Sequence, residues 1–182
     1  MALVLMCGLS FSGKSTLAAL LAAELPAEVL SLDRINQERG FDGGQGIAAG
    51  EWSTTNKMAH ERAIEALESG AHVIVDDTGS PRFVRDAWRD IATAAGVPFT
   101  IVWVQVSLDL QRQRVQADRE TRGRPDVTDA VLAEHAAHFE APSDESPLIV
   151  DASHTADPVT VEYLAAAIET EREGTQAIAE DG

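Results

Sequence analysis

The stretch Leu3-Val4-Leu5-Met6-Cys7-Gly8-Leu9-Ser10-Phe11-Ser12-Gly13-Lys14-Ser15-Thr16, close to the N-terminus, decides the fold. It begins with a five-residue apolar run typical of a buried strand, and an Ala- and Leu-rich segment typical of a helix follows over 17–25. Between them lies the pattern Gly-x-x-x-x-Gly-Lys-Ser, which is a P-loop. A P-loop placed between a strand and a helix predicts a nucleotide-binding α/β domain.

Each position of the P-loop has its own task. Gly8 and Gly13 let the backbone N–H groups and the start of the next helix surround a phosphate. Lys14 is expected to reach the β- and γ-phosphates and to act in catalysis, while the Ser15 hydroxyl binds the bridging Mg²⁺. The sequence therefore predicts ATP and Mg²⁺ as cofactors, held by Gly8, Ser10, Ser12, Gly13, Lys14, Ser15 and Thr16.

The composition predicts one soluble domain. The 182 residues are 45% hydrophobic, enough for one full core, and we place the domain at 1–173. No basic leader and no apolar run of about 20 residues is present, which favours a cytoplasmic protein without a membrane partner. Residues 174–182 lose periodicity and end in acidic side chains, so we expect a disordered tail. A monomer and a homodimer are both compatible with the sequence.

Apolar runs alternate with amphipathic segments, which is typical of a three-layer α/β fold with a parallel sheet. Five strands are predicted, at Leu3 to Cys7, Glu28 to Leu32, His72 to Asp76, Phe99 to Val106 and Pro147 to Asp151. The predicted helices cover Lys14 to Glu24, Glu51 to Glu68, Pro81 to Ala95, Leu108 to about Thr121, Asp126 to His138 and Pro158 to Glu173.

Acidic residues follow two of the predicted strands, at the sheet edge where such folds bind ligands. Asp33 follows the second strand, where it suits a catalytic base that accepts the acceptor hydroxyl proton; the alternative is a solvated carboxylate or a helix cap. Asp76 and Asp77 end the third strand. One should help to hold Mg²⁺ and the other should face the acceptor. We assign Asp76 to the metal and Asp77 to the acceptor, although the residues also allow the reverse.

Arginines are concentrated after the fourth strand, in a helical lid at about 108–126. Guanidinium groups on such a lid can neutralise a transferring phosphoryl group. Arg119 is our first choice for a catalytic contact, followed by Arg114 and Arg122, and all three are predicted to bind the nucleotide phosphates. Other arginines here should form only exposed ion pairs, which contribute little.

The segment over 37–50 is glycine-rich and is predicted to be a loop that faces the acceptor. We therefore include Glu38, Asp42 and Trp52 among the candidate acceptor-binding residues. Between Asp33 and Asp77 the carboxylates at 38, 42, 51, 61, 65 and 68 add to a chain of net charge −16. This charge makes a nucleic-acid partner improbable and favours a neutral or cationic acceptor.

The P-loop, Asp33, the Val-Ile-Val-Asp-Asp-Thr stretch at 73–78, Arg85 and the lid arginines follow one another in the order of a known group. The chain resembles small P-loop kinases that include the kinase domain of polynucleotide kinase, chloramphenicol phosphotransferase and the zeta toxins. The resemblance implies that Asp33 is the general base and that Asp77 and Arg85 face the acceptor. Residues Phe139-Glu140-Ala141-Pro142 also look like a stretch common in this group, without an evident role.

Three functions are compatible with these residues. We expect an ATP-dependent phosphotransferase acting on a hydroxyl of a small molecule, such as an aminoglycoside antibiotic. A kinase for the 5′-hydroxyl of a nucleic acid or nucleoside is the first alternative. A nucleotide-hydrolysing switch or chaperone is the second. The Asp76-x-x-Gly79 pattern of GTPases is a weak match, and with lysines only at 14 and 57 no guanine-binding motif can follow.

Overall fold

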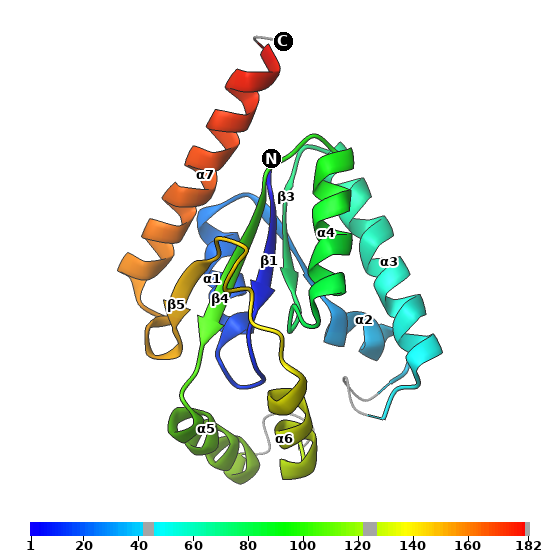
Figure 1. Cartoon of the computed structure of the whole chain (residues 1–182), viewed down its shortest axis with the longest axis vertical. Helices are drawn as coiled ribbons and strands as arrows, with labels where there is room; N and C mark the ends of the chain where they lie inside the picture. The colour runs from blue at the N-terminus through cyan, green and yellow to red at the C-terminus, as the bar shows by residue number, and fades with distance from the viewer. Residues whose placement is uncertain (42–45, 122–126, 181–182) are drawn as a thin grey trace.

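The computed structural model describes residues 1–41, 46–121 and 127–180. Its centre is a parallel sheet of five strands in the order β2-β3-β1-β4-β5 (Figure 1). The strands are β1 (Leu3–Cys7), β2 (Ala27–Ser31), β3 (His72–Asp76), β4 (Phe99–Gln105) and β5 (Leu148–Asp151). The predicted α/β P-loop fold with a five-stranded parallel sheet is confirmed.

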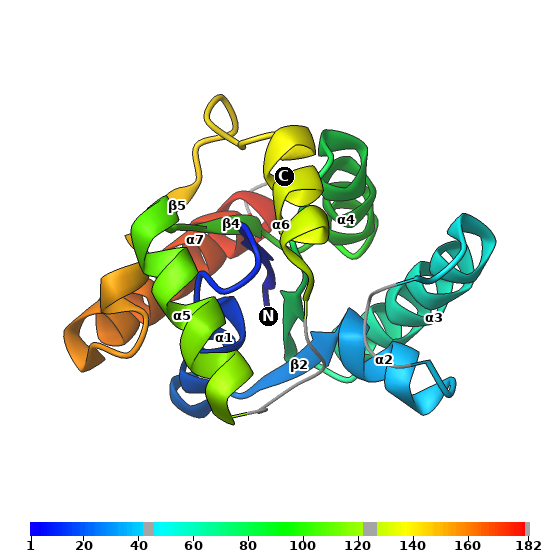
Figure 2. The same ribbon diagram turned by 90° about the horizontal axis from the view of Figure 1, so that it is seen from below.

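Helices cover both faces of the sheet and its carboxyl edge. They are α1 (Lys14–Glu24), α2 (Leu32–Glu38), α3 (Ala49–Glu68), α4 (Arg82–Ala94), α5 (Leu108–Thr121), α6 (Asp129–His138), the short 3₁₀ helix η1 (Ala152–His154) and α7 (Pro158–Glu180). Helices α3 and α4 lie on one side of the sheet and α7 on the other, whereas α5 and α6 lie beyond the ends of the strands (Figures 1 and 2).

The apolar run of β1 is continuous because both faces of this central strand are buried. Val4 and Met6 pack with Leu17, Leu21 and neighbours from α7, while the alternate residues face the other side. There Leu3 and Leu5 pack against α3 and α4. The side-chain period of two along a strand thus divides one apolar run between two cores.

Two elements differ from the sequence-based prediction. Helix α2 begins directly after β2, where the Ser31 hydroxyl accepts a hydrogen bond from the Arg34 N–H and caps it. Helix α7 continues past Gly174 to Glu180, so the predicted tail is helical over most of its length. One glycine in a helix costs only about 1 kcal/mol, which the good helix formers around it can offset.

Within the described ranges, no helix combines the length and the apolar character that crossing a membrane requires.

Candidate active site

The P-loop joins β1 to α1 and contains three residues with positive φ, namely Gly8 at 142°, Phe11 at 64° and Gly13 at 98°. A Cβ atom on Gly8 would lie 2.4 Å from the carbonyl oxygen of Val104, and one on Gly13 would lie 2.6 Å from the hydroxyl of Thr155. Both glycines are therefore required by close packing as well as by backbone conformation.

The carbonyl groups of the P-loop are held from outside by α5. Gln111 Nε2 donates to the Ser10 oxygen at 2.9 Å. Arg114 Nη1 donates to the oxygens of Phe11 at 3.0 Å and Ser12 at 2.7 Å, and its Nη2 donates to Ala152 at 2.7 Å. Because side chains of α5 donate hydrogen bonds to the carbonyl groups of the P-loop, the N–H groups of the loop can bind an anion. Gln111 and Thr155 were not among the sequence-predicted site residues.

Two side chains inside the loop fit a bound phosphate. Lys14 is 8% exposed, and its ammonium donates to the Leu9 carbonyl at 2.9 Å. Burial lowers the pKa of Lys14, while the carboxylates of Asp76 and Asp77 act in the opposite direction. The fully buried Ser12 hydroxyl has no hydrogen-bond partner in the described part of the chain. An ammonium and an unpaired hydroxyl in the P-loop are suitable hydrogen-bond donors for the oxygens of a bound triphosphate.

The end of β3 brings Asp76 and Asp77 to the P-loop. Burial raises the pKa of Asp76, and the nearby Ser15 hydroxyl acts against this by hydrogen bonding. Burial also raises the pKa of Asp77, whose carboxylate accepts hydrogen bonds from the N–H groups of Thr78 and Gly79. Ser15 and Asp76 together supply the hard oxygen ligands that Mg²⁺ uses beside phosphate. No cluster of three His, Cys, Asp or Glu side chains that could hold a metal ion occurs among the described residues.

Asp33 lies in the first turn of α2, exposed at the carboxyl edge of the sheet. Its charge acts on Lys14, Asp76 and Asp77, raising the pKa of each of the three groups. The structure thus brings together the residues that the sequence predicted for phosphate, metal and base.

Some predicted acceptor residues are engaged with the protein instead. The Glu38 carboxylate accepts a hydrogen bond from Arg62 Nη2 at 2.6 Å, which lowers the Glu38 pKa. Trp52 is partly buried and packs against the core formed with α3 and α4. Asp42 lies outside the described residues.

Arg85 is a correction to the sequence-based prediction. It was predicted to face the acceptor, yet its guanidinium is buried and binds Glu145, with Nε and Nη2 at 2.9 and 2.7 Å from Oε1. Although burial raises it, the pKa of Glu145 is lowered overall by the hydrogen bonds from Arg85 and Arg89. A buried guanidinium needs such partners, and a sequence does not show where they are.

The arginines of the predicted lid contact other parts of the protein. Its first half is fixed to the P-loop through Arg114, as described above, so this arginine contacts the loop rather than standing over the site. Arg119 Nη2 donates to the Val127 carbonyl at 3.0 Å and to Asp129 Oδ1 at 2.8 Å, which joins α5 to α6. Arg122 lies outside the described residues. The phosphate contacts predicted for these arginines remain predictions.

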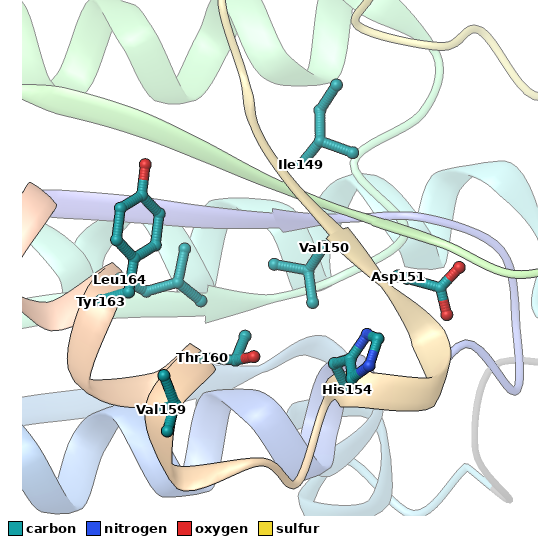
Figure 3. A pocket seen from close by; sticks show the side chains of 8 residues that line it. All are labelled: Ile149, Val150, Asp151, His154, Val159, Thr160, Tyr163 and Leu164. Carbon is teal, nitrogen blue, oxygen red and sulfur yellow. The ribbon is translucent and has the colours of Figure 1, made fainter.

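A pocket of about 340 Å³ lies at the opposite edge of the sheet from α2, between β5 and the start of α7 (Figure 3). Exposed apolar side chains, including Ile149 and Tyr163, form part of its wall, and Asp151 and His154 supply polar groups. Its lining includes none of the side chains predicted for phosphate, metal or base in the described chain. The converging charges at the P-loop, and not this shallow pocket, therefore define the candidate active site.

Comparison with known proteins shows the family to which the chain belongs. A family model described as an AAA domain matches residues 3–142. The adenylyl-sulfate kinase of Myxococcus xanthus strain DK1622 is 31% identical over 161 residues, which cover 85% of this chain and 82% of that protein. The KTI12 homolog of Arabidopsis thaliana is 31% identical over 147 residues, or 78% of this chain. The chain spans only about half (48%) of that second relative.

Among solved structures, the Kti12 of Chaetomium thermophilum in complex with ADP-AlF3 superposes with a TM-score of 0.74. The alignment covers 93% of this chain and 98% of that chain, at 16% identity. At this identity the similarity supports the fold alone.

Proposed function

The chain belongs to the AAA domain family and is one of its P-loop kinases, and from this premise we propose that it transfers the γ-phosphate of ATP to a hydroxyl group of a small molecule. The observation that carries the proposal is the convergence of Asp33, Asp76 and Asp77 on the P-loop lysine. A phosphotransferase needs a cation for the phosphates, an acid for the metal and a base for the acceptor, and this edge of the sheet supplies all three.

Each group of residues has its own role in the proposed phosphate transfer. The P-loop N–H groups and Lys14 bind the β- and γ-phosphates and hold the γ-phosphorus in line with the acceptor. Ser15 and Asp76 hold Mg²⁺, which neutralises charge on the phosphate oxygens when bound. Asp33 orients the acceptor hydroxyl and accepts its proton as the new P–O bond forms and the bond to ADP breaks. Asp77 binds a second polar group of the acceptor.

The acceptor is proposed to be a small polyhydroxyl compound, with an aminoglycoside as the specific candidate. The acidic composition of the segment between Asp33 and Asp77 supports a neutral or cationic acceptor. Glu38 is paired with Arg62, and Glu51 is paired with Arg39, so two of these charges are already neutralised. Asp33 and Asp77 beside the P-loop are the carboxylates proposed to attract a cationic acceptor, and their closeness favours a compact ligand over an extended polycation.

The test is a direct search for a phosphorylated product. The protein is incubated with Mg·ATP and a panel of aminoglycosides, chloramphenicol, sugars, adenylyl sulfate, nucleosides and a 5′-hydroxyl oligonucleotide, and products that gain one phosphoryl group are identified by mass spectrometry. The Asp33→Asn variant is the matched control. A phosphorylated small molecule with the wild type, absent with the variant, supports the proposal; a phosphorylated oligonucleotide instead assigns the nucleic-acid alternative.

A nucleotide-hydrolysing switch or chaperone is the second candidate function, favoured by the P-loop with its buried Lys14, which can act on ATP without any acceptor. Such a protein would hydrolyse ATP at a rate that no small hydroxyl compound changes. Hydrolysis without any phosphorylated product would assign this function in place of the kinase.

A further inference from the structure

The segment that follows α6 is fastened to the corner between β3 and α4. The Glu140 N–H donates to the Ser80 hydroxyl at 3.0 Å, and the Glu140 carboxylate accepts from the Arg82 N–H at 2.7 Å. Arg82 also pairs with Asp144 at 3.0 Å. This segment contains the Phe139-Glu140-Ala141-Pro142 stretch, which was noted in the sequence without a role. The structure therefore gives that stretch a fixed place next to the loop that follows Asp77.

Arg85 lies at the centre of this junction. It donates through Nη1 to the Glu140 carbonyl at 2.8 Å and to the Gly79 carbonyl at 2.7 Å, in addition to its two bonds with Glu145. The side chains of Arg85 and Glu145 are only 2% and 3% exposed. One guanidinium thus joins three separate acceptors, which its planar fork of donors permits and a lysine ammonium on a flexible stem does not reproduce.

The Gly79 carbonyl connects this junction to the active site. The N–H groups of Thr78 and Gly79 donate to the Asp77 carboxylate, and the Thr78 carbonyl accepts a hydrogen bond from Gly8 at 3.0 Å. Gly79 itself lies directly on β1, since a Cβ atom there would be 3.1 Å from both the Met6 oxygen and the Cys7 Cβ. The orientation of the peptide units over 77–79 consequently fixes both Asp77 and one side of the P-loop.

We propose that Arg85, held by Glu145, is a positioning residue that sets the 77–79 loop, and with it the Asp77 carboxylate, against the segment following α6. The role in catalysis rests on the proposed kinase function, whereas the placement of the loop does not. Arg85 itself contacts neither phosphate nor acceptor in this arrangement.

Cys7 offers a readout of loop position that does not depend on activity. It is the sole cysteine of the chain, its Sγ lies 3.5 Å from the Gly79 oxygen, and burial raises its thiol pKa to about 12. In the wild type the thiol should react very slowly with N-ethylmaleimide. If the 77–79 loop loosens, the thiol gains access to the reagent and labelling accelerates.

The variants are Glu145→Gln, which keeps the shape of the side chain, and Arg85→Lys, which keeps the positive charge. The control is Val161→Ala, a core change on the other side of the sheet, and urea unfolding measures the stability of each. We expect Cys7 labelling at least about tenfold faster in both junction variants than in the control at equal unfolding free energy. Equal labelling rates at equal stability would overturn the positioning role.

The same variants are then assayed with ATP. We expect kcat for phosphate transfer to fall about tenfold because Asp77 is displaced, and ATP affinity to fall less than kcat because the P-loop keeps its supports from α5. Full kcat in both variants would overturn the catalytic part of the inference. A wild type that phosphorylates no acceptor would refute the proposed function, and the labelling comparison would still decide the placement of the loop.

Discussion

The Lys14 ammonium donates to the carbonyl oxygen of Leu9 at 2.9 Å, so the P-loop lysine bonds to the loop that it follows. In a phosphate complex this bond is exchanged for contacts with triphosphate oxygens, which are charged and therefore stronger acceptors than a carbonyl. Because burial lowers the Lys14 pKa while Asp76 and Asp77 act against it, the arrival of further negative charge should favour the ammonium form.

Replacing Lys14 by methionine keeps the volume of the stem and removes the charge. We expect ATP affinity to fall at least about tenfold and phosphate transfer to fall further, because a charge-assisted bond to phosphate is lost. Titration with a fluorescent ATP analogue measures the first quantity and product formation the second. Lys57→Met, at the only other lysine, should change neither.

Asp33→Asn removes the proposed base and keeps the size of the side chain. Phosphate transfer should fall by about 10² or more, while ATP affinity stays within about twofold of wild type. Rapid-quench measurement of a single turnover separates this chemical step from binding. A turnover rate near that of the wild type would leave Asp33 as an exposed carboxylate in the first turn of α2, without a role in catalysis.

The raised pKa values of Asp76 and Asp77 predict opposite effects of acid on function and on stability. Below its raised pKa an aspartate is neutral, so Mg·ATP-dependent activity should decline at a pH above the ordinary aspartate value of about 3.9. Stability should instead be lost as pH rises through the raised pKa, because the folded protein binds this proton more tightly than the unfolded chain does.

The variant Asp77→Asn tests the predicted effect of pH on stability. At pH 7 the variant should unfold with a free energy about 1 kcal/mol higher than the wild type, while phosphate transfer is impaired. The difference in stability should be smaller at pH 4 than at pH 7, because the wild-type carboxyl binds its proton increasingly as pH falls through its raised pKa. Urea denaturation at the two pH values decides between this outcome and an equal effect at both.

The pairing of Arg119 with Asp129 predicts a contrast between two substitutions. If Arg119 must leave Asp129 to reach phosphate, Arg119→Ala should lower kcat about tenfold or more, whereas Asp129→Ala should preserve or raise it. Similar losses in both variants would mean that the pair holds α5 and α6 together and nothing else. Steady-state kinetics with saturating ATP distinguishes the two cases.

The variants Gly8→Ala and Gly70→Ala distinguish the free-energy cost of a strained backbone from the cost of a steric clash. Both glycines have positive φ, but a Cβ atom on Gly70 meets nothing within 4 Å, while one on Gly8 meets the Val104 carbonyl at 2.4 Å. The first change should cost about 2–4 kcal/mol of unfolding free energy and the second about 1. Thermal unfolding of the two variants measures the difference.

Most of the fold was predictable because hydrophobic period and helix signals are local. The bounds of β1, β3, α1 and α5 agree with those predicted, β4 and β5 differ by one residue at one end, and β2 is shifted by one residue at both ends. Helix α2 was missed because seven residues give too little periodicity to stand out from the glycines after them. Helix α7 was ended too early because residues 174–182 lose hydrophobic periodicity, although the helix continues to Glu180.

The site was predictable where chemistry is encoded in adjacent residues and not where it depends on partners far along the chain. The P-loop, Asp33 and Asp76-Asp77 each follow a strand, so parallel topology alone brings them together. The family resemblance assigned Arg85 to the acceptor, and nothing near Arg85 in the sequence shows that its partner is Glu145, 60 residues later. The phosphate contact predicted for Arg114 stays a prediction, and the sequence did not show that Arg114 also donates to the carbonyls of Phe11 and Ser12.

The support of the P-loop by α5 and η1 has a consequence for the order in which this protein becomes competent during synthesis. The anion cradle belongs to the first 15 residues, but its outer carbonyls are satisfied by Gln111 and Arg114, and Thr155 packs on Gly13. A nascent chain that has left the ribosome only as far as β4 would carry the complete motif without its supports. Nucleotide affinity should thus arise late in translation, once the residues through Thr155 have emerged and folded back on the first strand.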